Sequence, residues 1–368
     1  MKASRYQVYV SFSGESSSKT ENVRSYAPDG TCLGSVLNAD PGAYRELRGL
    51  AVDDAGRLYV ADAYKKSSVV DVFSAKINAD GFSRDFLGTL ITPETSAALL
   101  HPYGLAFDGG DLFVSSQDTN VVSRYELSGK KKMPSAKNAP VARYLEKLSP
   151  KNGYYAGTFV ASAQPVTVGS DTPPAVDPDD GGLSSVGFDV QTAAAEHGAG
   201  DDAADDAQSA SKQKRHSVRG IAFAGKRLYV ADQAKNRVGI YGHKNGTFHG
   251  WISTTTDPTA NPDTLAMPVG LALNPDDGRI YIGSPKNEAI FSYDPTKKNL
   301  RLVVSSASSG AGHALKDVSG LSFTPSGTLI FGSRSQKRLY ACEVSTGAIT
   351  EFGEQLDDVP ECVLVVPI

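Results

Sequence analysis

The chain has 368 residues, of which 40% are hydrophobic and 21% are charged, and its formal net charge is −4. These proportions are typical of a soluble globular protein, and the slight acidity argues against general binding of nucleic acid or of an acidic membrane surface, since either would favour a basic face. No run of about 18 apolar residues is present, so we expect no membrane span.

The chain begins with predicted strands that lack a first partner. Residues 6–12, 22–26 and 31–37 are short apolar segments of strand length, separated by turn-forming residues. Later in the chain, each comparable set of strands follows a first strand that begins at a glycine. Residues 361–366, Glu-Cys-Val-Leu-Val-Val, match this missing first strand. We therefore predict that the C-terminal strand completes the N-terminal sheet.

A longer phrase then recurs. Residues 48–62 read Arg-Gly-Leu-Ala-Val-Asp-Asp-Ala-Gly-Arg-Leu-Tyr-Val-Ala-Asp, and residues 219–232 repeat most of it. Each copy contains a glycine at the start of its first strand, which we call the marker glycine. The marker glycines recur about every 50 residues, except for one interval roughly twice as long. They are Gly49, Gly104, Gly220, Gly270 and Gly320. Each copy reads as strands joined by tight turns, with a third and a fourth strand following. Four antiparallel strands per unit predict an all-β, six-bladed β-propeller.

The long interval is explained by an insertion at residues 129–216, between the third and fourth blades. We expect a short helix at 141–148 and a strand at 155–161, after which Pro, Gly, Ala and Asp dominate. Such a composition buries too little apolar surface to offset the entropy of ordering, so we expect residues 162–215 to be disordered. We interpret residues 1–368 as a single propeller with a surface insertion; a lid or binding segment and a seventh blade are the alternatives.

The copies resemble the NHL repeat, a propeller repeat that reads roughly Pro-x-Gly-hydrophobic-Ala-hydrophobic, then Gly-x-hydrophobic-Tyr-Val-Ala-Asp, then Asn-x-Arg. The best copy runs from Val218 to Tyr241 and carries Asn236-Arg237, and the resemblance covers most of the chain outside residues 129–216. It implies the six-bladed architecture but no particular activity, because one fold hosts many unrelated functions.

In a propeller, the first strand of each blade lines the central channel, so the residue before each marker glycine is expected at one channel mouth. These residues are Arg48, Tyr103, Arg219, Val269, Ser319 and Glu361. The ends of the second strands should lie nearby, at Asp62, Tyr64, Gln117, Asp232, Gln233, Ser284, Lys286 and Arg334.

The two rim arginines point to an anionic ligand, because guanidinium groups at a concave mouth suit carboxylate or phosphate. We predict a binding or interaction module that recognises an anionic small molecule or an acidic protein segment through Arg48, Tyr103, Arg219, Ser319 and Glu361. In the alternative arrangement, Arg48 pairs with Glu361 and Arg219 pairs with another carboxylate, which would only neutralise the channel.

Two metal-dependent propeller families provide a comparison for the rim. Gluconolactonase-type propellers hold a calcium-like cation with Glu, Asn and Asp, and Arg48 and Arg219 would repel that cation. Peptidyl-amidoglycolate lyases hold zinc with rim histidines, which this rim lacks, although Tyr64 occupies the place of that family's functional tyrosine. We therefore expect no metal and no cofactor. The alternative function is a metal-independent lyase or hydrolase of a small anionic substrate, with Glu361 and Tyr64 as catalytic candidates.

Other residue types carry less specific signals. Cys32, Cys342 and Cys362 form neither a disulfide framework nor a metal pattern, so we expect buried, inert thiols. Asp62 and Asp232 recur in a repeat-specific position and are expected to bind backbone amides of the following turn. The N-terminal residues lack the apolar core of a secretory signal. We expect a cytoplasmic monomer if the sequence is full length, and a secreted or periplasmic protein if a leader was removed.

Overall fold

The computed structural model describes residues 5–14, 20–39, 44–64, 68–93, 96, 98–127, 142–144, 158–161, 217–244, 246–252, 264–309 and 312–368. Regular structure in these ranges is almost entirely β-strand. The exceptions there are one turn of α-helix, α2 (Ser306–Ser309), and the 3-10 turns η2 (Gln233–Lys235) and η3 (Pro285–Asn287). No helix within the described ranges is long and apolar enough to cross a membrane.

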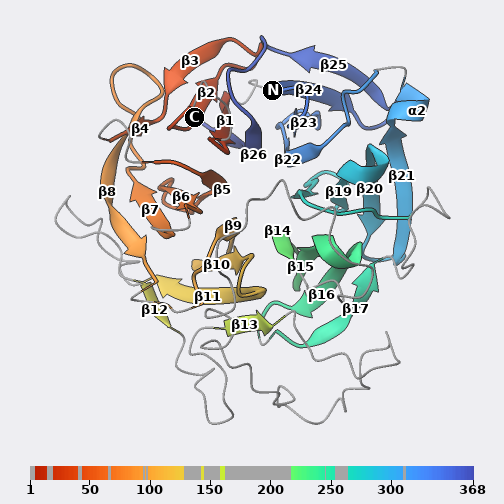
Figure 1. Cartoon of the computed structure of the whole chain (residues 1–368), viewed down its shortest axis with the longest axis horizontal. Coiled ribbons are helices and arrows are strands. Elements are labelled where there is room, and N and C mark those ends of the chain that lie inside the picture. The colour runs from red at the N-terminus through yellow and green to blue at the C-terminus, as the bar shows by residue number, and fades with distance from the viewer. Residues whose placement is uncertain are drawn as a thin grey trace, which may run out of the picture.

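The strands form six small sheets arranged around a central axis, which makes the fold a six-bladed β-propeller (Figure 1). The first blade has the order β26 (Pro360–Pro367), β1 (Tyr6–Phe12), β2 (Arg24–Tyr26) and β3 (Cys32–Ser35). The second contains β5 (Leu47–Val52), β6 (Leu58–Asp62), β7 (Val69–Phe73) and β8 (Arg84–Ile91). A short parallel strand, β4 (Leu37–Asn38), extends this second sheet beside β8.

The third blade contains β9 (Pro102–Asp108), β10 (Asp111–Ser116) and β11 (Val121–Leu127), with β12 (Ala142–Tyr144) and β13 (Thr158–Ala161) both paired to β11. The fourth contains β14 (Val218–Ala224), β15 (Arg227–Asp232), β16 (Arg237–Gly242) and β17 (Phe248–Ile252). The fifth contains β18 (Leu271–Leu273), β19 (Ile280–Ser284), β20 (Ala289–Asp294) and β21 (Asn299–Ser305). The sixth contains β22 (Val318–Phe323), β23 (Leu329–Ser333), β24 (Arg338–Glu343) and β25 (Ala348–Phe352).

The predicted closure of the ring is confirmed. β26 pairs antiparallel with β1, from Tyr6 opposite Pro367 to Phe12 opposite Pro360. The two ends of the chain thus share one blade, in which β26 takes the innermost position (Figure 1). Backbone hydrogen bonds between the termini therefore hold the first blade together.

The insertion differs from expectation in one respect. Residues 142–144 form the strand β12, where a short helix was expected, because hydrogen bonds to the edge of β11 provide an alternative to local helix formation. The strand expected at 155–161 is present as β13. Both strands belong to the third blade, so the described residues contain no seventh blade. The disorder expected for residues 162–215 lies outside the described residues.

The hydrophobic core lies between neighbouring blades, because each sheet packs face to face against the next. The second strand of a blade is covered on both faces, and β6 and β19 are buried at every position. The outermost strands β8 and β25 are partly exposed. Between the second and third blades, the rings of Tyr59 and Phe107 meet edge to face at 4.9 Å. The apolar runs of the repeat are thus explained by burial against both neighbouring sheets.

The marker glycines are required where neighbouring first strands meet. β26, β5, β9, β14, β18 and β22 contact one another in a closed cycle around the channel (Figure 1). A Cβ atom on Gly49 would collide with the carbonyl oxygen of Tyr103 in the next blade, and one on Gly270 would collide with that of Ser319. The repeat therefore needs glycine to allow close approach of the backbones. In the first blade, the corresponding position is Cys362.

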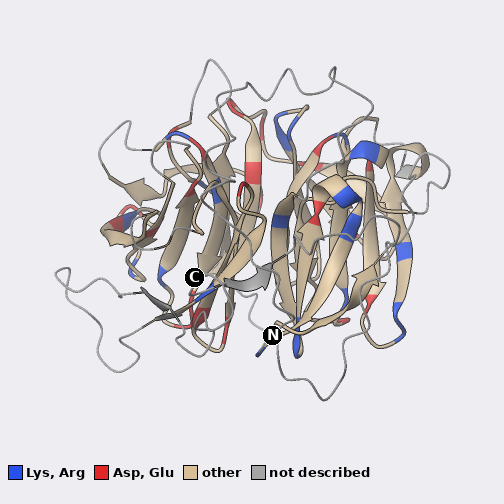
Figure 2. Ribbon diagram, turned by 60° about the horizontal axis from the view of Figure 1, so that its bottom comes forward, with Lys and Arg blue, Asp and Glu red and all other residues tan. Residues whose placement is uncertain are grey.

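Charged residues of both signs are mixed in this chain, whose net charge is only −4. Basic and acidic residues are interspersed along the strands and loops of the ribbon in Figure 2, and neither kind gathers in one region of this view. A cluster of charged side chains at the channel therefore does not reflect a charge excess over the whole chain.

Candidate functional site at the channel mouth

The starts of four first strands bring charged and aromatic side chains together at one end of the channel. Arg48, Tyr103, Arg219 and Glu361 are connected there by ion pairs and ring contacts. Arg334, which follows β23, joins them through Glu361. We call these five residues the polar mouth. The sequence-based prediction placed the first four on one rim and Arg334 close to it.

Arg48 and Glu361 form a buried ion pair between the second and first blades. The side chains of Arg48 and Glu361 are only 5% and 1% exposed, and Arg48 Nη1 contacts Glu361 Oε1. Arg48 Nη2 also donates to Glu46 Oε1 at 2.5 Å. Burial disfavours the charge of Arg48, but the carboxylates of Glu361 and Glu46 outweigh it and raise the pKa of Arg48. For Arg48, the neutralised arrangement is therefore the observed one.

Glu46 extends this network to a histidine. Its Oε1 lies 3.2 Å from His101 Nε2. Burial alone would raise the pKa of Glu46, but the hydrogen bond with His101 and the charge of Arg48 lower it. The sequence-based prediction missed Glu46. A signal was available, since Glu46 stands two positions before Arg48 and alternate residues of an extended strand share a face.

Tyr103 lies between the arginines. Its hydroxyl donates to Glu361 Oε2 at 3.3 Å, and its ring centroid is 5.8 Å from Arg48 Cζ and 4.9 Å from Arg219 Cζ. Burial, followed by the negative charge of Glu361, raises the pKa of Tyr103 to about 12. Tyr103 is therefore a neutral hydrogen-bond donor near pH 7 and offers its ring to both cations.

Arg219 is bound differently from Arg48. Its Nε donates to Gln233 Oε1 at 2.8 Å, and its Nη1 donates to Gln117 Oε1. Among the described residues, no carboxylate forms an ion pair with Arg219, which differs in this respect from Arg48. Burial lowers the pKa of Arg219, and the positive charges of Arg48 and Arg334 act in the same direction.

Arg334 lies at the more exposed side of the polar mouth. Its Nε is 3.1 Å from Glu361 Oε1, and its side chain is 36% exposed. Glu361 therefore contacts two guanidinium groups and the hydroxyl of Tyr103. Both oxygens of its carboxylate are engaged in these contacts.

Two predicted site residues have other roles. Ser319 is buried, and its hydroxyl donates to the carbonyl oxygen of Pro360 at 2.9 Å rather than joining the ion pairs. Tyr64 packs its ring against Arg45, whose Cζ lies 5.3 Å from the ring centroid. Among the described contacts, the Tyr64 side chain reaches neither Arg48 nor Glu361.

The repeated aspartates bind backbone amides: Asp62 binds one in the turn that follows it, as expected, whereas Asp232 binds an amide just before β14. Asp62 Oδ1 accepts hydrogen bonds from the amides of Glu46 and Tyr64, and Asp232 Oδ1 accepts one from the amide of Ser217. Each carboxylate thus fixes the backbone beside the mouth. In the described part of the chain, no group of three or more His, Cys, Asp or Glu side chains is placed to hold a metal ion.

The cysteines agree only partly with expectation. Cys342 is buried, but Cys32 is exposed, because it lies on β3 at the outer edge of the first blade. Cys362 lines the channel, and burial raises its pKa to about 11.

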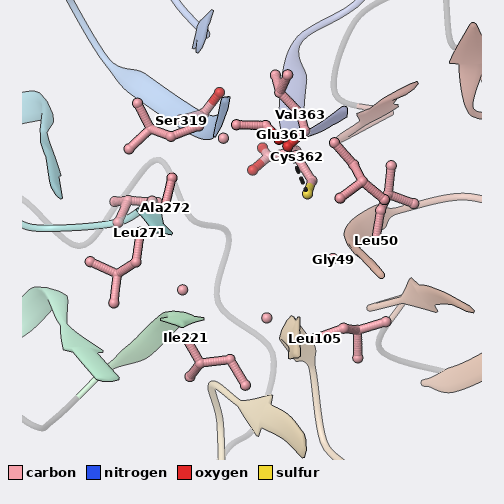
Figure 3. A pocket seen from close by; sticks show the side chains of 18 of the residues that line it. Gly49, Leu50, Leu105, Ile221, Leu271, Ala272, Ser319, Glu361, Cys362 and Val363 are labelled. Carbon is pink, nitrogen blue, oxygen red and sulfur yellow. Dashed lines mark hydrogen bonds between the residues drawn. The ribbon is translucent and has the colours of Figure 1, made fainter. Parts of the chain in front are cut away.

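Beyond the polar mouth, the channel contains a cavity of about 400 Å³. Arg48, Tyr103, Ser319 and Glu361 border it at the polar end, and aliphatic side chains of the first strands surround the rest. Figure 3 shows these aliphatic side chains around the channel, with Glu361 and Cys362 side by side. The cavity thus has one polar end and predominantly apolar walls.

Comparison with known proteins identifies the fold. No family model matches the chain, and no curated protein matches it. A chain in the crystal structure of a nidogen/laminin complex superposes with a TM-score of 0.59 at 10% identity, with 98% of both chains covered. A proposed 6-phosphogluconolactonase from Bacteroides uniformis gives 0.56 at 15% identity, covering 99% of this chain and 100% of the other. A Lactobacillus plantarum protein gives 0.52 at 12% identity, with 99% of both covered. Such identities show the propeller fold alone, and membership of the NHL family stays a prediction.

Proposed function

We propose that the protein is a binding module whose polar mouth recognises an anionic group, a carboxylate or phosphate carried by a small molecule or by an acidic protein segment. The observation that carries this proposal is the environment of Arg219. Its guanidinium group is held by the neutral amide oxygens of Gln117 and Gln233 and by the ring of Tyr103, without a carboxylate partner among the described residues.

An anion at this position would relieve an unfavourable electrostatic environment. Burial lowers the pKa of Arg219, and the charges of Arg48 and Arg334 add to this effect, while Tyr103 and Glu361 oppose it. The three guanidinium groups are therefore close enough to repel one another, and Glu361 offsets only part of that repulsion. A carboxylate or phosphate bound to Arg219 and Arg334 would reduce that repulsion and accept paired hydrogen bonds. The glutamines would hold the Arg219 guanidinium in place before the ligand arrives.

The same geometry argues against the enzyme alternative. A general base needs a carboxylate that can take a proton from a substrate, whereas Glu361 is bound to Arg48, Arg334 and Tyr103. Tyr64, the second catalytic candidate, packs on Arg45 instead. The relatives in fold include both an interaction complex and a proposed enzyme, so the fold itself favours neither.

The test is a titration of inorganic phosphate, citrate and polyglutamate against the protein at constant ionic strength, read out by thermal unfolding and calorimetry. A ligand that binds only the folded state raises the unfolding temperature. We expect at least one of these probes to stabilise the wild type, and Arg219→Gln to abolish that effect.

The matched control is Arg301→Gln, which removes the same charge from an exposed position on β21. This variant should respond like the wild type. A response to polyglutamate alone would assign the site to a protein segment, and a response to phosphate or citrate would assign it to a small molecule. No response beyond that of sodium chloride, or an equal loss in both variants, would reject the proposal.

A further inference from the structure

The channel cavity extends beyond Arg219 and Arg334, the two residues to which the anion is proposed to bind. Its volume of about 400 Å³ falls within the range of small-molecule pockets, about 300–1,000 Å³. Its wall receives one aliphatic side chain from each blade, two positions after each rim residue: Leu50, Leu105, Ile221, Leu271, Leu321 and Val363. The ring of aliphatic groups makes the wall apolar on every side.

The cavity is hollow because of the repeat itself. Gly49, Gly104, Gly220, Gly270 and Gly320 line it without contributing a side chain. Packing between neighbouring first strands prevents larger residues at these positions, since a Cβ on Gly220 or Gly320 would collide with backbone atoms of the next blade. Cys362 has the corresponding position in the first blade and lines the same space (Figure 3). The space is therefore built into the fold and cannot be filled from these positions.

The polar end of the cavity offers little to a charged ligand. Arg48 is paired with Glu361 and Glu46, and the hydroxyl of Tyr103 donates to Glu361. The hydroxyl of Ser319 is bound to Pro360. An ion entering the cavity would lose its hydration without gaining a dedicated partner, which is unfavourable. Water is also poorly held in an apolar space, because each molecule needs two to four polar partners.

The other end of the cavity leads to solvent. Exposure increases along β18 from partly buried Leu271 to Leu273, which is 37% exposed, and along β22 from buried Leu321 to partly buried Phe323. Leu273 and Phe323 line the cavity at this end. A ligand would therefore enter from the face opposite the polar mouth and meet apolar side chains along its path.

We propose that this cavity is a second binding site, which takes one small, uncharged, apolar molecule. Apolar contact with six aliphatic side chains supplies the favourable free energy, and the paired polar groups at the polar end offer no partner to a charged compound. The cavity shares Arg48, Tyr103 and Glu361 with the polar mouth, but Arg219, which carries the proposal of anion recognition, does not line it, so either proposal can fail without the other.

The test compares two fluorescent probes with the same ring skeleton, neutral N-phenyl-1-naphthylamine and anionic 8-anilinonaphthalene-1-sulfonate. We expect the neutral probe to bind saturably, at one molecule per chain. Its Kd should be at least about tenfold lower than that of the sulfonate. Arg219→Gln should leave the neutral probe unaffected.

Two substitutions fill the cavity from different blades, Cys362→Phe and Leu271→Phe. Each should weaken binding of the neutral probe at least about tenfold. Leu302→Phe provides the matched control, because Leu302 is exposed on the outer strand β21. This variant should bind the neutral probe like the wild type. Circular dichroism and thermal unfolding establish that each variant is folded.

A measurement on the unmodified chain keeps the proposal testable if both filled variants fail to fold. The neutral probe should slow alkylation of Cys362 by N-ethylmaleimide at pH 9 and leave alkylation of the exposed Cys32 unchanged, as measured by peptide mass spectrometry. Absence of saturable binding, tighter binding of the sulfonate, unchanged binding in folded cavity-filling variants, or equal protection of both cysteines would overturn the proposal.

Discussion

Glu361→Gln should be one of the most destabilising single substitutions in the channel. Breaking a buried ion pair by removing one partner costs about 3–5 kcal/mol, because the remaining charge stays buried. The side chains of Arg48 and Glu361 are 5% and 1% exposed, so solvent screens this pair little. Arg48 keeps Glu46 at 2.5 Å, which places the expected cost near the lower end, about 3 kcal/mol.

The assay is equilibrium unfolding in urea, followed by tryptophan fluorescence and circular dichroism. Glu351→Gln provides the control, since it breaks a surface pair in which Arg338 and Glu351 lie 2.7 Å apart and Glu351 is 61% exposed. That change should cost less than about 1 kcal/mol. Arg48→Met combined with Glu361→Leu should recover part of the loss, because no unpaired charge is left in the channel. A cost of Glu361→Gln no larger than that of Glu351→Gln would refute this reasoning.

Three further predictions concern the blade seams, the mouth and the thiols. Gly270→Ala should lower the free energy of unfolding in urea by about 1–3 kcal/mol, because the added Cβ meets the backbone of the next blade. Gly225→Asn is the control: Gly225 has φ +56° and open space around it, so the loss should be less than about 1 kcal/mol. Glu46→Gln should be less stable than the wild type at pH 7. The pKa of Glu46 is lowered in the folded state, so its charge contributes fully to stability above the unfolded pKa of about 4.3 and this contribution disappears as the pH falls through the folded pKa. The stability difference between the variant and the wild type should therefore shrink on acidification. A difference that stays constant with pH would contradict this prediction. A thiol reagent at pH 8 should modify Cys32 well before Cys342 and Cys362, whose pKa values are raised to about 11 by burial, and mass spectrometry of timed samples checks this order.

Several local features of the sequence were enough to predict the architecture. The glycine period predicted six blades, and the unmatched strands at the two ends predicted that β26 closes the first one. Local reasoning failed where pairing with a distant strand decided the outcome. Residues 142–144 became a strand because β11 provides an edge. Cys32 is exposed because β3 is the outermost strand of its blade, which strand propensity alone does not reveal.

The candidate site divides in the same way. The order of Arg48, Tyr103, Arg219 and Glu361 around one mouth followed from the repeat, since the residue before each marker glycine has the same place in every blade. The choice of partners did not follow from it. Arg48 pairs with Glu361 from the other end of the chain, whereas Arg219 binds Gln117 and Gln233 from two blades.

By itself, the sequence determined the fold, the closure of the ring and the residues at the rim, because these depend on periodic spacing, strand patterning and the need for glycine between adjacent backbones. Only the tertiary structure decided which charges are paired, that Glu361 is bound on both oxygens, and that a cavity of about 400 Å³ lies behind the polar mouth. The physical reason is that ion pairing and cavity volume depend on side chains that several blades bring together, and their separation along the chain carries no information about those contacts.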